Sequence, residues 1–287
     1  MTAAFIVLTY NRSDALLAVL RALAPQCAAG DTVLIADDGS RPEHVQALRD
    51  GLPAFACPVR HVWHPDVGFT AARARNLGAS LAGTEYLVFL DGDCVPNRHF
   101  ARHHAALAQP GHFLNGSRVL LGERLSRRAL RGEIQLAQLG ALDWLRLRAA
   151  GEVNKLTHLL YWPGAPGRVQ TAFQWKGIRS CNFGVWYRDF EAVNGFDESF
   201  SGWGHEDADL VLRLHHHGCR RKNGFLATEV FHLWHPESGR EGEAANRERV
   251  VQRMQGGLVR AQQGLAELPR GAATVTLLNE RWREQRA

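Results

Sequence analysis

The sequence predicts an α/β fold in which one mainly parallel central sheet is flanked by helices in a single domain. Short apolar runs that suit buried strands alternate with helical patterns over the first hundred residues. Strands separated by helices favour parallel pairing, because the chain must cross the face of the sheet before the next strand. The length of 287 residues is ordinary for one such domain.

Apolar runs and helix-start signals place the first elements. Their predicted order is strand 4–9, a helix after Ser13, strand 32–36, a helix from Pro42, strand 59–63, helix 70–81 and strand 86–90. Proline is tolerated in the first turn of a helix. Thr70 can cap the third helix, and Gly83 can close it.

The remainder of the chain is less regular. Residues 111–175 hold a basic stretch and an amphipathic stretch, and the tail 239–287 is charged, predicted to begin as a helix, and includes an apolar segment at 273–278. The arginines are Arg118, Arg124, Arg127, Arg128 and Arg131, and the large apolar positions are Leu136, Leu139, Leu142, Trp144, Leu145 and Leu147. The segment from Arg118 to Arg148 can form a lid over the acceptor or touch anionic lipid, and the alternative is a solvated helical face.

Composition excludes several classes of protein. No apolar stretch is long enough to span a bilayer, and the N-terminus lacks the basic region of a signal peptide, so we expect a cytoplasmic location. The five cysteines are odd in number and none form a C-x-x-C pair, which argues against a disulfide framework or a thiolate zinc site. The net charge of +5 suits a surface that faces phosphate or anionic lipid.

Polar residues follow three of the predicted strands. They are Thr9-Tyr10-Asn11, Asp37-Asp38 and Asp91-Gly92-Asp93. Ligands of parallel sheets bind at the carboxyl ends of the strands. Asp91 and Asp93 lie two residues apart, so in extended chain both point to one side. Two converging carboxylates repel each other unless a proton or a cation intervenes, and oxygen ligands favour Mg²⁺ or Mn²⁺. The alternative is a solvated Asp-Gly turn.

A second cluster combines glycines, an aromatic residue and two acids. It is Gly202-Trp203-Gly204-His205-Glu206-Asp207. Glycines allow a ligand to approach the backbone, tryptophan offers a face on which a sugar can stack, and a carboxylate can remove a proton from a hydroxyl. The alternative is a helix whose first turn carries acids for electrostatic reasons, which fits Asp209 better than Asp207.

Histidines form a third group. His232 and His235 can join carboxylates around a first-row metal, or they can be partly buried structural residues. Histidines 215–217 end a predicted helix, where the helix dipole accounts for them. The G-x-G-x-x-G dinucleotide loop and the G-x-x-x-x-G-K-[ST] phosphate loop are both absent, which disfavours a dehydrogenase or a P-loop ATPase.

Over residues 3–236 these segments resemble, in order, the family-two inverting glycosyltransferases of GT-A fold with a galactosyltransferase-like C-terminal half. The matching segments are Thr9-Tyr10-Asn11-Arg12, Asp37-Asp38-Gly39-Ser40, Gly68 with Ala74-Arg75-Asn76, Phe89-Leu90-Asp91-Gly92-Asp93, Cys181-Asn182-Phe183-Gly184, Gly195-Phe196-Asp197-Glu198 and Gly202 to Asp207. The chain departs from the family where Asn194 replaces the first of two usual glycines, outside the expected chemistry.

The resemblance implies a role for each matching residue. The donor pocket would contain Thr9, Tyr10, Asn11, Arg12, Asp37, Asp38, Arg75, Asp91 and Gly92. Asp93 would be the principal metal ligand, helped by Asp91 and by His232 or His235. Asp207 would be the general base, and Trp203, Gly204 and Glu206 would contact the acceptor.

The resemblance also implies an activity and an organisation. It implies metal-dependent transfer, with Mn²⁺ or Mg²⁺, from a UDP-hexose or UDP-N-acetylhexosamine to a glycan or glycolipid hydroxyl in bacterial surface polysaccharide or lipopolysaccharide synthesis. No nucleic acid is expected, and any membrane contact would be peripheral, at the inner face of the plasma membrane. The expected divisions are a nucleotide-sugar half (1–110), a variable region (111–175), an acceptor and catalytic half (176–238) and a helical tail (239–287). Alternatives are a sugar-phosphate nucleotidyltransferase and a non-catalytic carbohydrate-binding protein.

Overall fold

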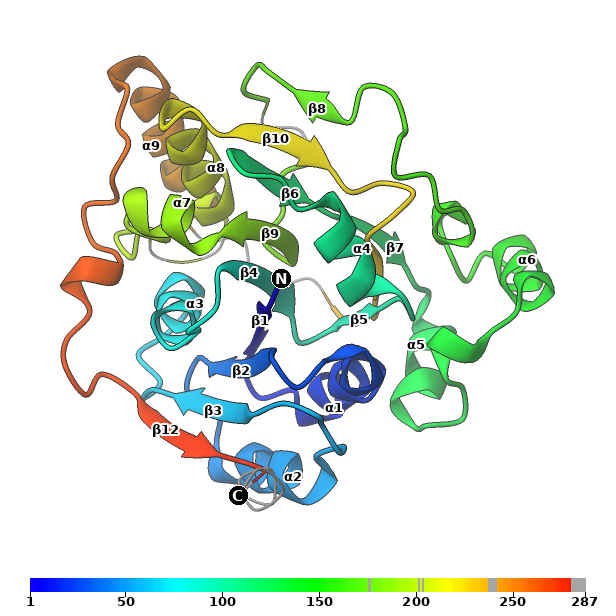
Figure 1. Cartoon of the computed structure of the whole chain (residues 1–287). Helices are drawn as coiled ribbons and strands as arrows, with labels where there is room; N and C mark the ends of the chain where they lie inside the picture. The colour runs from blue at the N-terminus through cyan, green and yellow to red at the C-terminus, as the bar shows by residue number, and fades with distance from the viewer. Residues whose placement is uncertain (175–176, 201, 203, 237–241, 280–287) are drawn as a thin grey trace.

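The computed structural model describes residues 1–174, 177–200, 202, 204–236 and 242–279, and a large sheet runs through its centre (Figure 1). Its strands are β1 (Ala3–Thr9), β2 (Thr32–Asp37), β3 (Val59–Trp63), β4 (Tyr86–Asp91), β6 (His112–Asn115), β8 (Val169–Gln170), β9 (Asn182–Trp186), β10 (Arg220–Asn223) and β12 (Thr274–Leu277). Their spatial order is β12-β3-β2-β1-β4-β9-β6-β10-β8. The four strands predicted from the N-terminal sequence are confirmed.

The sheet is parallel in one half and mixed in the other. Strands β3, β2, β1 and β4 are parallel neighbours, as the alternation of strands and helices predicts. Beyond β4 the direction reverses, because β9 is antiparallel to both β4 and β6. At the opposite edge, β12 pairs antiparallel with β3. The apolar segment predicted at 273–278 is therefore an edge strand of the main sheet.

Helices cover both faces of this sheet (Figure 1). They are α1 (Ser13–Leu23), α2 (Pro42–Gly51), α3 (Ala71–Ser80), α4 (Phe100–Leu107), α5 (Glu123–Leu130), α6 (Ala141–Ala149), α7 (Tyr187–Ala192), α8 (Glu206–His216) and α9 (Glu243–Gly256). Successive residues of a strand point to opposite faces. Phe5 and Val7 accordingly belong to the core beneath α1, whereas Ala4 and Ile6 belong to the core beneath α3.

Small residues let α3 approach the sheet closely. A Cβ at Gly78 would lie 3.0 Å from Ile6 of β1, so the close approach leaves little room for a side chain there. Thr70 precedes this helix as predicted, but its hydroxyl donates to Asp38 at 2.5 Å and does not cap the helix. A capping hydroxyl would accept a backbone N–H of the first turn, whereas here the Thr70 hydroxyl donates to a carboxylate.

A second, three-stranded sheet lies beside the carboxyl end of β4. It consists of β5 (Cys94–Pro96), β11 (Glu229–His232) and β7 (Ser117–Leu120), in the order β5-β11-β7. The turn from β4 into β5 presses against β1: the Gly92 N–H donates to the Leu8 carbonyl at 2.7 Å, and a Cβ on Gly92 would lie 2.6 Å from that oxygen. Glycine is required at this position, and it fixes where Asp93 lies.

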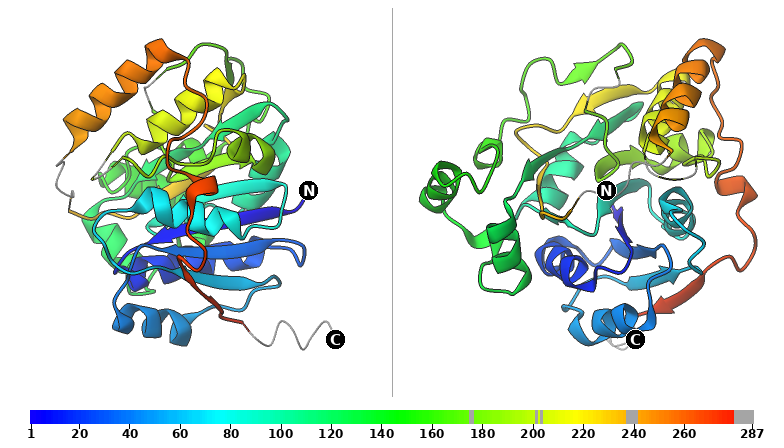
Figure 2. Two further views of the ribbon diagram at one scale, coloured as in Figure 1. Left: turned by 90° about the vertical axis from the view of Figure 1, so that its left-hand side faces the viewer. Right: turned by 180° about the vertical axis from the view of Figure 1, so that it is seen from behind.

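The C-terminal region returns to the body of the molecule. Helix α9 lies along α8 (Figure 2), and Arg253 of α9 forms ion pairs with Asp209 at 2.6 Å and Asp197 at 2.9 Å. Asp209 also pairs with Arg213 at 2.7 Å and is buried, so its role is structural, as its position in the sequence favours. Within the described residues, no helix combines the length and apolar character needed to cross a membrane.

Candidate active site

A cavity of about 710 Å³ opens at the carboxyl ends of β1 and β4. The turn that holds Asp91 and Asp93 lines one side of it, and the first turn of α8, with Glu206 and Asp207, lines another. His232 and His235 also face this cavity. The two acidic segments that the sequence singles out, more than a hundred residues apart in the chain, therefore share one cleft.

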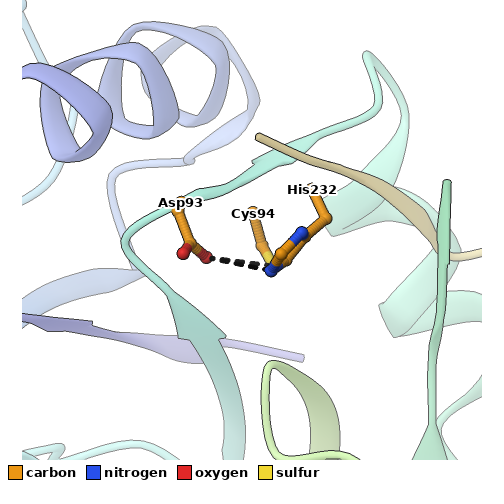
Figure 3. A group of neighbouring side chains, drawn as sticks. All are labelled: Asp93, Cys94 and His232. Atoms are coloured by element: carbon orange, nitrogen blue, oxygen red, sulfur yellow. Dashed lines mark hydrogen bonds and ion pairs between the residues drawn. The ribbon is translucent and has the colours of Figure 1, made fainter. Parts of the chain in front are cut away.

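Asp93 lies beside Cys94 and His232 (Figure 3), and it also contacts His235. Its Oδ1 lies 3.8 Å from His232 Nε2, and its Oδ2 lies 3.2 Å from His235 Nε2. The Cys94 thiol donates to Asp93 Oδ1 at 3.5 Å. Both histidines predicted as metal candidates thus contact the predicted principal ligand, through different oxygens of its carboxylate.

The charges at this turn favour an ionised acid. Burial raises the pKa of Asp93, but the hydrogen bond from His235 and the electrostatic effect of His232, His235 and Arg12 outweigh it, so the net shift is downward. Burial lowers the pKa of His232, whereas the hydrogen bond to Asp93 raises the pKa of His235. A carboxylate beside a neutral imidazole is a donor set suited to a divalent cation.

Arg75 joins the two acidic segments. It lies on α3 with 4% of its side chain exposed, and its two terminal nitrogens lie 2.9 Å from Asp91 Oδ1 and 3.3 Å from Glu206 Oε1. Burial lowers the pKa of Arg75, but these carboxylates raise it to a net upward shift. The sequence places Arg75 near the nucleotide; in the structure its guanidinium lines the cleft and binds carboxylates of the chain itself.

Asp207 has an unusual environment for a carboxylate. It lies in the first turn of α8, after His205 in the left-handed conformation, and it accepts the N–H groups of Ala208 at 2.7 Å and Ser180 at 3.3 Å. Burial, followed by the nearby charge of Glu206, raises the pKa of Asp207 to about 7. The charge of Arg75 acts in the opposite direction. A carboxyl group with a pKa near neutrality can exchange a proton at physiological pH.

The loop after β1 presents the residues expected to hold the nucleotide. Tyr10 is 47% exposed, and its hydroxyl donates to Asp66 at 2.8 Å. Asn11 has a positive φ of 50°, and its N–H donates to Ser40. Arg12 pairs with Asp14 at 3.3 Å, and Thr9 is buried at the end of β1. Leu8, which precedes this loop in β1, lines the cleft, so the loop lies next to it.

Asp37 and Asp38 lie at the end of β2 and are both buried. Asp37 contacts His61 at 2.7 Å and the Ser40 N–H at 2.7 Å. Asp38 contacts Thr70 and, at 3.1 Å, His64. Neither is among the residues that line the cleft. In the structure these carboxylates hold neighbouring loops together, and their expected contact with base or ribose stays a prediction.

Trp203 lies outside the described residues, so its expected stacking on a sugar stays a prediction. Gly204, its neighbour, lines the cleft as expected for the acceptor side. Ser180 lines the cleft and Cys94 contacts Asp93, and neither had an assigned role in the sequence; Arg118, which also lines the cleft, belongs to the basic segment with two interpretations. Cys94 follows Asp93 directly in the sequence, and this adjacency could have marked it as a neighbour of the proposed metal ligand. Ser180 carries no local signal, because only the folded chain brings it to the cleft.

The chain matches known glycosyltransferases in sequence. Residues 4–141 match the model of glycosyl transferase family 2, and residues 168–236 match the model described as the N-terminal domain of galactosyltransferase. Together the two matches cover most of the chain in the order that the sequence motifs predict. Residues 4–141 therefore form a glycosyltransferase family 2 domain.

Individual relatives are enzymes of the same class. Validoxylamine A glucosyltransferase of Streptomyces hygroscopicus subsp. limoneus is 29% identical over 228 residues, which are 74% of this chain and 48% of that protein. Chondroitin synthase of Escherichia coli is 27% identical over 279 residues, which are 87% of this chain and 37% of that protein. The chain therefore spans about half, or less, of the length of these curated relatives.

Solved structures agree on the fold. S. aureus TarS 1-349 in complex with UDP-GlcNAc has a TM-score of 0.57 at 15% identity, covering 93% of this chain and 69% of that one. GalNAc-T7 with UDP, GalNAc and Mn²⁺ has a TM-score of 0.54 at 17% identity, covering 88% of this chain and 48% of that one. The fold is the GT-A fold that the sequence predicts.

The raised pKa of Asp207 predicts a pH-dependent stability difference. An unfolded aspartate ionises near pH 3.9, so between that pH and about 7 the unfolded chain loses this proton before the folded chain does. Ionisation thus destabilises the fold as pH rises through this window. Relative to wild type, Asp207→Asn should gain on the order of 4 kcal/mol in free energy of unfolding between pH 4 and pH 8.

Urea unfolding at several pH values measures this difference. The exposed carboxylate of Asp14 offers a control, since Asp14→Asn should follow the wild-type curve. Parallel curves for Asp207→Asn and wild type would contradict the raised pKa.

Proposed function

We propose that this chain transfers a sugar from a nucleotide diphosphate sugar, of the UDP-hexose or UDP-N-acetylhexosamine type, to a hydroxyl of a glycan or glycolipid with inversion of configuration. One observation carries the proposal: the Asp93 turn and the Glu206–Asp207 corner line a single cleft. An inverting displacement needs a leaving-group site and a base on opposite sides of one reacting carbon, and this cleft offers a candidate for each.

The Asp93 turn is the proposed diphosphate side. Its ionised carboxylate and adjacent imidazole fit Mn²⁺ or Mg²⁺, held by Asp93 with Asp91 and His232 or His235. When bound, such a cation offsets the charge that develops on the departing nucleoside diphosphate. Thr9, Tyr10, Asn11, Arg12, Asp37, Asp38 and Gly92 are the proposed nucleotide contacts. The UDP-bound states of the two structural neighbours support a uridine nucleotide.

Asp207 is the proposed general base. Its carboxylate accepts the proton of the acceptor hydroxyl while that oxygen forms a bond to the anomeric carbon, and the bond from that carbon to the diphosphate oxygen breaks. A pKa of about 7 suits both taking up the proton and releasing it after transfer. Glu206, with Oε1 held by Arg75, orients the acceptor, and Trp203 and Gly204 complete its site.

The acceptor pathway proposed is bacterial surface polysaccharide or lipopolysaccharide synthesis. The similarity to chondroitin synthase of Escherichia coli and hyaluronan synthase of Pasteurella multocida supports a polysaccharide product. In this proposal residues 1–110 bind the donor, residues 176–238 bind the acceptor and carry the catalytic acids, and residues 111–175 and 239–287 vary with the substrate.

A peripheral contact with anionic membrane belongs to this proposal. On α6, Leu142 is 69% exposed and Leu145 is 51% exposed, and the exposed guanidinium of Arg146 lies on the same helix. Leu120 and Trp234 are also exposed and line the cleft. Exposed apolar and basic residues on α6, together with exposed apolar residues at the cleft, suit an acceptor carried by a lipid.

Removing the proposed base should separate binding from transfer. We expect Asp207→Asn to lower kcat by about a hundred- to ten-thousandfold, because general-base assistance contributes that much. The affinity for the nucleotide sugar should stay within about threefold, because the amide keeps the size of the carboxyl group. Steady-state release of nucleoside diphosphate and calorimetric donor titration measure the two quantities; turnover near wild type would refute the role, and release of pyrophosphate would point to nucleotidyl transfer.

Removing the proposed metal ligand should abolish metal-dependent donor binding. Asp93→Asn is expected to weaken the binding of UDP-sugar in the presence of Mn²⁺ by about tenfold or more, because the cation loses its charged protein ligand. The matched control is Asp50→Asn, an exposed carboxylate on α2 outside the cleft. Calorimetry with and without Mn²⁺ is the measurement, and equal affinities for Asp93→Asn and wild type would count against the site.

The membrane contact predicts co-sedimentation with anionic vesicles at low salt. Replacing Leu142 and Leu145 together by serine should reduce the bound fraction several-fold, because it removes the apolar area that enters the interface. The control Val251→Ser changes an exposed apolar residue on α9 and should bind like wild type. If wild type stays in the supernatant, the membrane contact is wrong, while sugar transfer can still be tested with a water-soluble acceptor.

A further inference from the structure

The cation site contains a sulfur atom that its oxygen-ligand prediction does not include. In the pairing of β5 with β11, Cys94 lies directly opposite His232, and Asp93 immediately precedes Cys94 in the chain. One potential ligand atom from each of these three residues lies within 4.8 Å of the others (Figure 3). Strand pairing thus brings together sulfur, nitrogen and oxygen donors from positions more than a hundred residues apart.

With the thiol of Cys94 included, this donor set differs from the one that Mg²⁺ and Mn²⁺ prefer. These ions favour carboxylate, carbonyl and water oxygens, whereas thiolate and imidazole favour Zn²⁺ and other ions of intermediate softness. A catalytic zinc site usually has three protein ligands and an open fourth position. Cys94 is fully buried, so thiols in solution would not readily replace its sulfur at a bound ion.

The two histidines have different positions relative to this trio. His232 belongs to it, and its Nε2 faces Asp93 Oδ1. His235 contacts the other oxygen, Asp93 Oδ2, at 3.2 Å, and its Nδ1 is 2.8 Å from the carbonyl of Pro236. A ring held at both nitrogens in this way orients a ligating carboxylate, as outer-shell partners of metal ligands do.

We propose that Asp93, Cys94 and His232 form a mixed sulfur, nitrogen and oxygen site that binds Zn²⁺ or Co²⁺ more tightly than Mn²⁺ or Mg²⁺, with His235 as the positioning residue of Asp93. The inference rests on the proposed cation site and names its ligands and its metal class. As the sulfur–metal bond forms, the Cys94 S–H bond breaks and the proton passes to solvent. The open position remains for a diphosphate oxygen.

Cobalt spectroscopy on the full chain, without donor, tests the sulfur ligand. Co²⁺ bound to a thiolate gives a sulfur-to-cobalt charge-transfer absorption that oxygen and nitrogen ligands do not give. We expect this band in wild type, its loss in Cys94→Ser, and its displacement by added Zn²⁺. Cys181→Ser is the matched control, because Cys181 is a buried cysteine beside Cys94 that is not part of the trio, and it should keep the band.

Metal competition provides the second measurement. Cys94→Ser should weaken the affinity for Zn²⁺ by about tenfold or more and change the affinity for Mn²⁺ by less than about threefold, because only the softer ion depends on sulfur. Cys94→Ala serves as a second variant, and circular dichroism verifies that each variant is folded. Co²⁺ binding without the charge-transfer band would overturn the sulfur ligand and leave the proposed transferase intact. Failure of every ion to bind wild type would overturn both this site and the metal dependence of the proposed function.

Discussion

The cleft depends on one buried guanidinium. Arg75 on α3 lies between Asp91 at the end of β4 and Glu206 at the start of α8, and it contacts both. Without the positive charge of Arg75, the carboxylates of Asp91 and Glu206 would repel each other, and the two segments that carry them would move apart. A buried charge is tolerated only when it is paired, so the acids stabilise Arg75 as Arg75 stabilises them. The geometry of the cleft follows from this mutual requirement.

The same charge balance leaves neighbouring acids in different protonation states. Asp93 has histidines as partners, and its pKa falls; Asp207 has an acid and a low-polarity environment as neighbours, and its pKa rises to about 7. Arg75 limits the second shift without cancelling it. One cleft therefore offers an ionised carboxylate for a cation and a titratable one for a proton. Two acids in contrasting environments are a common basis for assigning such roles.

The sequence predicted the parallel half of the sheet well, because its strands are continuous apolar runs bounded by helix signals. The prediction of Val59–Trp63 matches the observed strand, and the other three differ from it by a residue at their ends. The other strands were harder to predict: β9, β10 and β12 are short, and their pairing joins residues far apart in the chain. Local patterns do not contain that information.

By itself, the sequence determined the family, the α/β core and the identity of the acidic segments, because ordered motifs and apolar periodicity are local properties of the chain. The tertiary structure decided how those segments are used. It paired Arg75 with carboxylates of the chain and buried Asp37 and Asp38 in contacts with other side chains. It also placed Cys94 opposite His232. Each of these depends on strand register and burial, which arise only when distant segments pack together.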